Sequence, residues 1–89
     1  MDDPIERLIG EKVVLDTGTP IVYVGILREV SQHTFVLDEA DLHDCRDGHS
    51  TTEVYVAQAA GGGVTANRNS IVVMRSVVIS LSRLGDVIT

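Results

Sequence analysis

Aromatic residues are scarce in this sequence. The 89 residues include no tryptophan, two tyrosines and one phenylalanine, so aromatic side chains make up 3% of the chain. The 44% of residues that are hydrophobic are mainly valine, isoleucine, leucine and alanine. Because β-branched side chains favour strands, this composition predicts a β-rich core with little surface for ring stacking.

Cysteine and long apolar stretches are also rare. Cys45 has no second cysteine with which to form an internal disulfide. There is no run of about 18 apolar residues and no basic-then-apolar leader. We therefore expect a cytoplasmic protein that makes no contact with a membrane.

Basic residues are outnumbered by acidic ones. Seven lysines and arginines face 13 aspartates and glutamates, which gives a net charge of −6 and a pI near 4.7. This balance opposes generic nucleic-acid binding, which depends on positive charge. The charge is uneven, however: residues 38–53 carry six carboxylates against Arg46, whereas Arg68, Arg75 and Arg83 are the charged residues between 54 and 85. One basic surface on an acidic molecule is compatible with this pattern.

No catalytic motif is present. The Gly61 to Gly63 run lacks the Lys-Ser/Thr pair and the following helix of a phosphate-binding loop. We predict that the protein is not an enzyme and uses no cofactor, and no small-molecule substrate is evident from the sequence. A chain of 89 residues fits one domain that hides only about two-thirds of its unfolded surface when it folds alone, so assembly would add stability.

The pattern of residues predicts a short helix followed by strands. Asp3 as N-cap, Pro4 at the first helical position and Gly10 as a stop indicate the helix. Strands are expected from 11 to 17, from 21 to 30 with a bend at Gly25, and from Phe35 onward, separated by turns at 17–20 and 32–33. The apolar block 71–81 divides near Arg75 into two further strands.

Residues 41–70 are predicted to form a long insertion or protruding ribbon within a single domain that spans 1–89. The acidic segment 38–52 is a candidate loop. The segments 54–58 and 64 onward are predicted as strands of a hairpin, with Gly61 to Gly63 at its tip.

Two segments resemble the signatures of the Sm-like family. Gly25-Ile26-Leu27, Ser31-Gln32-His33 and Phe35-Val36-Leu37 follow the rhythm of its first signature, and the segment from Val73 to Ile79 is similar to its second. The resemblance covers roughly Pro4 to Leu81. It implies an all-β fold, a small SH3-like (Sm-like) barrel of five bent antiparallel strands with a short N-terminal α-helix.

The resemblance also implies a function. In Sm-like proteins two turns meet around the pore of a ring and hold single-stranded RNA. By position, the RNA-binding residues of this chain would be Gln32, His33, Thr34, Arg75 and Ser76. A homo-oligomeric ring is expected independently, because the segment 72–79 offers a strand edge with apolar side chains on both faces.

Two alternatives stay open. The acidic balance favours an oligomeric scaffold or interaction module that binds no RNA. The segment 41–49 concentrates His43, Cys45 and His49 among aspartates, which are possible ligands of a transition metal, although their spacing matches no strong zinc pattern. A solvated polar loop explains this segment equally well, and we assign no metal-binding residue.

Overall fold

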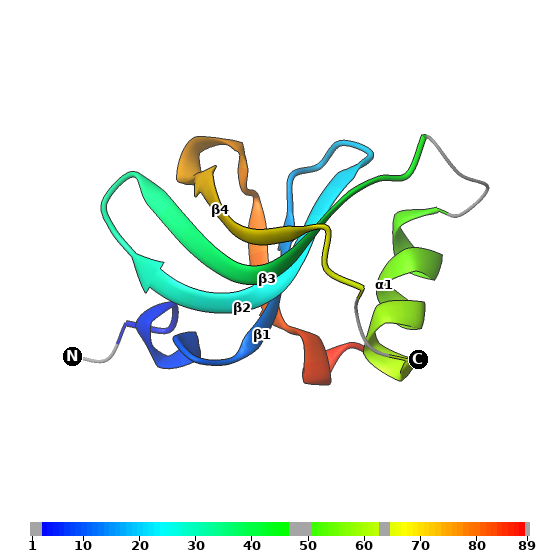
Figure 1. Cartoon of the computed structure of the whole chain (residues 1–89), viewed down its shortest axis with the longest axis horizontal. Coiled ribbons are helices and arrows are strands. Elements are labelled where there is room, and N and C mark those ends of the chain that lie inside the picture. The colour runs from blue at the N-terminus through cyan, green and yellow to red at the C-terminus, as the bar shows by residue number, and fades with distance from the viewer. Residues whose placement is uncertain (1–2, 47–50, 63–64, 89) are drawn as a thin grey trace.

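The computed structural model describes residues 3–46, 51–62 and 65–88. It is built on one antiparallel sheet of five strands in the order β4-β3-β2-β1-β5 (Figure 1). The strands are β1 (Lys12–Asp16), β2 (Ile21–Val30), β3 (Thr34–Asp44), β4 (Arg68–Met74) and β5 (Ser80–Arg83). β4 and β5 are the two edges of this sheet, and within the described residues they do not pair with each other.

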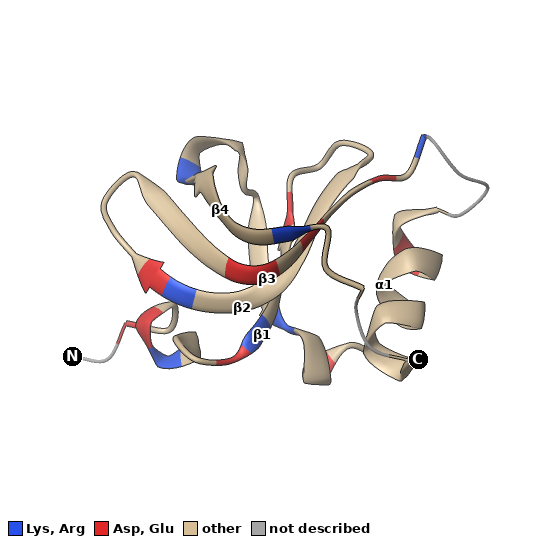
Figure 2. Cartoon of the chain, viewed as in Figure 1, with Lys and Arg blue, Asp and Glu red and all other residues tan. Residues whose placement is uncertain are grey.

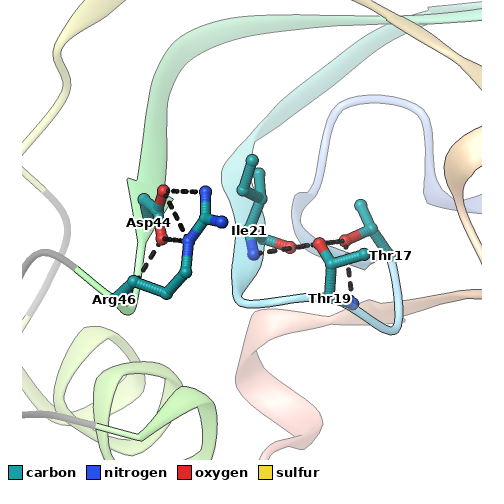
Figure 3. A network of polar contacts seen from close by, with 5 residues as sticks. All are labelled: Thr17, Thr19, Ile21, Asp44 and Arg46. Atoms are coloured by element: carbon teal, nitrogen blue, oxygen red, sulfur yellow. Dashed lines mark hydrogen bonds and ion pairs between the residues drawn. The ribbon is translucent and has the colours of Figure 1, made fainter.

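The predicted hairpin of β1 and β2 is confirmed. Its turn is fixed by threonine hydroxyls: the Thr17 hydroxyl donates to the carbonyl of Ile21 at 2.7 Å, and the Ile21 N–H donates to the Thr19 hydroxyl at 3.1 Å (Figure 3). Gly18 has a φ of 72°, a conformation that glycine adopts without steric cost. The turn therefore follows from the Thr-Gly-Thr-Pro sequence itself.

The predicted bend at Gly25 coincides with an irregularity of the sheet. The pairing of β2 with β3 shifts register between Val24 and Ile26, as in a β-bulge. A Cβ atom added to Gly25 would lie 3.1 Å from backbone and side-chain atoms of Ala40. A larger side chain would push the two closely spaced strands apart, so glycine is favoured here.

The hydrophobic core lies on one face of the bent sheet. Its buried residues come from β1 to β4, and they are Val13, Leu15, Leu27, Phe35, Leu37, Ala40 and Val73. Ile5 and Leu8, which precede β1, pack against this cluster. Apart from Phe35, the core therefore has the aliphatic composition seen in the sequence.

The prediction of an N-terminal α-helix is wrong. Residues Glu6–Leu8 form a single 3₁₀ turn, η1. The side chain of Asp3 does accept the N–H of Ile5 at 2.8 Å, as a helix cap would. The Gly10 N–H then donates to the Leu27 carbonyl at 2.7 Å, so the chain joins the sheet before a second turn can form.

The predicted strand at 54–58 is wrong. These residues belong to the α-helix α1 (Thr52–Gly62), which stands at one end of the sheet (Figure 1). The Thr51 hydroxyl accepts the N–H of Val54 at 3.2 Å and caps the helix start. At this end of the sheet the helix packs against a smaller cluster, which consists of Val14, Val22, Val24, Ala59 and Leu84. The loop predicted from residue 38 also begins later, because β3 continues to Asp44.

The predicted division of the last apolar block is confirmed. A 3₁₀ turn, η2 (Arg75–Val77), separates β4 from β5, and a third, η3 (Leu84–Asp86), follows β5. No helix in the described part of the chain is long and apolar enough to cross a membrane.

Candidate nucleic-acid interface

The turn between β2 and β3 lies beside η2. The antiparallel pairing of β3 with β4 places Thr34 opposite Met74, and the Arg75 N–H extends this ladder by donating to the His33 carbonyl at 2.9 Å. The two turns share a hollow of about 390 Å³ lined by Gln32, His33, Met74, Arg75 and Ser76. We call these five residues the turn surface.

Arg75 connects the two turns through its side chain. Its Nη1 donates to the Ser31 carbonyl at 2.7 Å, and the centre of its guanidinium lies 5.0 Å from the centroid of the Phe35 ring. A cation over an aromatic face contributes about 0.5–1 kcal/mol at exposed sites. The half-buried guanidinium is therefore held in place at the edge of the hollow.

Ser31 organises the turn from which Gln32 and His33 project. Its hydroxyl oxygen accepts the N–H of Thr34 at 3.1 Å and that of His33 at 3.4 Å. It also lies 2.7 Å from the Thr34 hydroxyl, with which it shares a hydrogen bond. Serine commonly closes turns in this way. The sequence interpretation did not assign this role to Ser31, although a serine before a polar turn is the usual signal for it.

Four of the five predicted site residues line the hollow together. Gln32 and His33 are exposed, and neither side chain hydrogen-bonds to another described residue. Thr34 is half-buried and bonded to Ser31 instead. Met74 lines the hollow but was not predicted. Alternation along β4 is the signal that could have identified it, because it places Met74 on the same strand face as Val72, and both are more than half exposed.

Arg75 is the charged residue of the turn surface. The turn between β2 and β3 carries no charged position, while acidic positions are spread over β2, β3 and α1 (Figure 2). The turn surface is thus a polar patch with one cation on a molecule of net charge −6. Uncharged donors and acceptors next to one guanidinium can bind the edges of bases and a phosphate.

His43 and Cys45 of the segment 41–49 have structural partners. The rings of His43 and Tyr55 stack with centroids 3.9 Å apart, and the Thr52 hydroxyl lies 3.6 Å from the Cys45 sulfur. Among the residues that the structure describes, no group of three or more His, Cys, Asp or Glu side chains could hold a metal ion. His49 lies outside the described residues.

Tyr55 also donates its hydroxyl to the carboxylate of Asp41. Burial of the phenol raises the pKa of Tyr55 well above its ordinary value, and the hydrogen bond to Asp41 raises it further. Asp44, near the end of β3, forms an ion pair with Arg46 at 2.6 Å (Figure 3). Hydrogen bonds from Arg46 lower the pKa of Asp44 to about 2.

The fold is similar to that of a solved Sm protein. The structure of the Pyrococcus abyssii Sm protein in complex with a uridine heptamer aligns with a TM-score of 0.61 at 16% sequence identity, covering 92% of this chain and 99% of that chain. No model of a known protein family matches this sequence, and no curated protein matches it. The chain therefore has an Sm-like fold, established by structure and not by sequence.

Proposed function

We propose that this protein forms a homo-oligomeric ring and binds single-stranded RNA at the turn surface. The observation that carries the proposal is the convergence of the β2–β3 turn and η2 on one hollow, within an Sm-like fold. The similar Sm protein was solved with a uridine heptamer. That likeness supports single-stranded RNA as the ligand class, and the positions of Gln32, His33, Arg75 and Ser76 supply the site.

The chemistry of the turn surface suits an unstacked nucleotide. Gln32 offers an amide that can both donate and accept, His33 offers a ring for stacking, and Arg75 offers a fixed cation. Stacking on an aromatic ring contributes about 1–3 kcal/mol per base. Thr34 is assigned a supporting role, since its hydroxyl is bonded to Ser31.

Ring assembly is supported by the unpaired edges of the sheet. Among the residues that the structure describes, β4 and β5 each pair with one strand. Val72 and Met74 on β4 are 59% and 54% exposed, and Ile79 before β5 is 70% exposed. Pairing of β4 in one subunit with β5 in the next would satisfy both edges and bury these side chains. A monomer in light scattering would contradict this part of the proposal.

The test is a titration of labelled oligouridine and oligoadenosine, followed by fluorescence anisotropy at low salt. Gln32→Ala should weaken binding by roughly five- to tenfold, because one hydrogen bond is lost. Gln58→Ala on α1 is the matched control, since Gln58 is also exposed and lies outside the turn surface. Arg75→Ala should abolish binding, and wild-type affinity should fall with rising salt as phosphate contacts predict.

The alternative is an oligomeric scaffold that binds no RNA. The net charge of −6 favours it, because an acidic molecule repels the phosphate backbone. An intact ring that binds neither oligonucleotide at low salt would support the scaffold and overturn the RNA proposal.

A further inference from the structure

A second hollow lies at the irregularity between β2 and β3. It has a volume of about 350 Å³, a floor formed by Val24, Gly25 and Ile26, and polar walls that include Lys12, Glu39 and Asn69. None of its lining residues belongs to the turn surface. We call it the bulge pocket.

The bulge pocket is lined by two charged side chains of opposite sign that form no ion pair with each other. Within the described residues, the side chains of Lys12 and Glu39 form no ion pair and no hydrogen bond, and the amide of Asn69 is likewise without a partner. The nearby Arg28 and Asp38 differ, because they pair at 3.0 Å. The pocket thus presents an ammonium, a carboxylate and a carboxamide whose bonding capacity is left to a ligand or to water.

The backbone of Glu39 is held in an uncommon conformation. Among the described residues, Glu39 is the only non-glycine residue with a positive φ, at 48°. Such residues are rare outside sites that impose the conformation. Glu39 lies in the stretch where the register of β2 and β3 shifts, and bulges commonly redirect side chains next to binding sites. The fold therefore fixes the point from which this carboxylate extends.

We propose that the bulge pocket binds a small zwitterion of the α-amino acid class. The ligand carboxylate pairs with Lys12, its ammonium pairs with Glu39, and Asn69 hydrogen-bonds to either group. An anion such as a phosphate would be repelled by Glu39, and a purely apolar ligand would take water from three polar groups without replacing it. The volume lies at the small end of the range of ligand pockets, about 300–1,000 Å³, which suits a molecule of this size.

The test is a titration of each common free amino acid, one at a time, into ¹⁵N-labelled protein followed by NMR. We expect at least one to shift the amide signals of Lys12, Gly25 and Glu39 and to leave those of Gln32 and His33 unchanged. For that amino acid, the N-acetyl derivative and the methyl ester should both bind about tenfold more weakly, since each lacks one charge.

Two variants with matched controls assign the charges. Lys12→Ala and Glu39→Gln should each weaken binding by about tenfold. Arg7→Ala and Glu11→Gln change the same charges at exposed positions outside the pocket and should leave affinity unaltered. Amide spectra and melting temperatures of all four variants verify that each is folded.

Three results would overturn the proposal. They are the absence of shifts with every amino acid up to about 10 mM, equal binding of the acetylated and free forms, and equal effects of the pocket variants and their controls. A protein that binds no RNA would leave the proposal intact, because the bulge pocket and the turn surface have no residue in common.

Discussion

Tyr55 joins α1 to β3 through a hydrogen bond and a ring contact. The variant Tyr55→Phe tests how much the hydrogen bond contributes to stability. The hydroxyl of Tyr55 donates to Asp41, while its ring stacks on His43 with the two planes inclined by 2°. Phenylalanine keeps the ring and the stacking but removes the hydroxyl. The substitution therefore isolates one hydrogen bond between helix and strand.

The expected loss of stability follows from the partners of that bond. Hydrogen bonds to charged groups contribute about 1.5–3 kcal/mol, and the acceptor Asp41 is half-buried, so solvent compensates part of the loss. We expect the free energy of unfolding to fall by about 1.5–2 kcal/mol. For a domain of this size, that decrease lowers the melting temperature by roughly 6–16 °C.

Thermal and urea unfolding, monitored by circular dichroism at a fixed protein concentration, measure the effect. Asp41→Ala and the double variant complete a double-mutant cycle, in which the second substitution should add little once the first has removed the bond. A Tyr55→Phe protein as stable as the wild type, or additive effects in the cycle, would refute the assigned role of this hydrogen bond.

Three further predictions concern packing and pH. Gly25→Ala should destabilise the protein by about 1–3 kcal/mol in urea unfolding, because the added Cβ crowds β3. The control Gly61→Ala in α1, whose added Cβ meets no atom within 4 Å, should instead stabilise the protein by up to about 1 kcal/mol. Equal effects of the two variants would contradict the close approach of β2 and β3 at Gly25. The raised pKa of Tyr55 contributes stability that is complete below pH about 10 and is lost as pH rises further. The wild type should therefore lose melting temperature above pH about 10 more steeply than Tyr55→Phe does. The same alkaline loss in both proteins would argue against this role of Tyr55. The pKa of Asp44, about 2, should rise toward about 3.9 in Arg46→Ala when titrated by NMR, and an unaltered titration would show that Arg46 is not the cause.

The sheet could be predicted from the sequence because its signals are local. Thr17 to Pro20 combines turn-forming residues between two apolar segments, and Gly25 interrupts a strand that is apolar on both faces. The division at Arg75 follows from the length of the apolar block. Each of these features depends on neighbours in sequence. The approximate bounds of β1 and β2 and the position of the β4–β5 junction could therefore be predicted.

The helix α1 was missed because its stability comes from distant residues. Val54, Tyr55 and Val56 favour strands by propensity, yet Tyr55 and Ala59 are four residues apart and meet the sheet through Asp41, His43 and the smaller cluster. Tertiary contacts override propensity in such cases. The N-terminal helix was over-predicted for the opposite reason, because its cap is present but its contacts with the sheet leave room for only one turn.

The candidate site was predicted by position and completed by geometry. The resemblance to Sm-like proteins placed Gln32, His33 and Arg75 in two turns, but the hydrogen bond from Arg75 to the Ser31 carbonyl depends on how β3 pairs with β4. A contact between residues 44 positions apart leaves little trace in a sequence. It becomes visible once the register is known.

The most direct test of the central claim is a native mass spectrum of the protein at low salt, recorded with and without oligouridine. One spectrum reports both the assembly and the bound RNA. A ring that binds oligouridine through the turn surface predicts a single multimeric mass that increases by whole RNA molecules, and no such increase for Arg75→Ala. A monomer, or a multimer whose mass the RNA leaves unchanged, would contradict the claim.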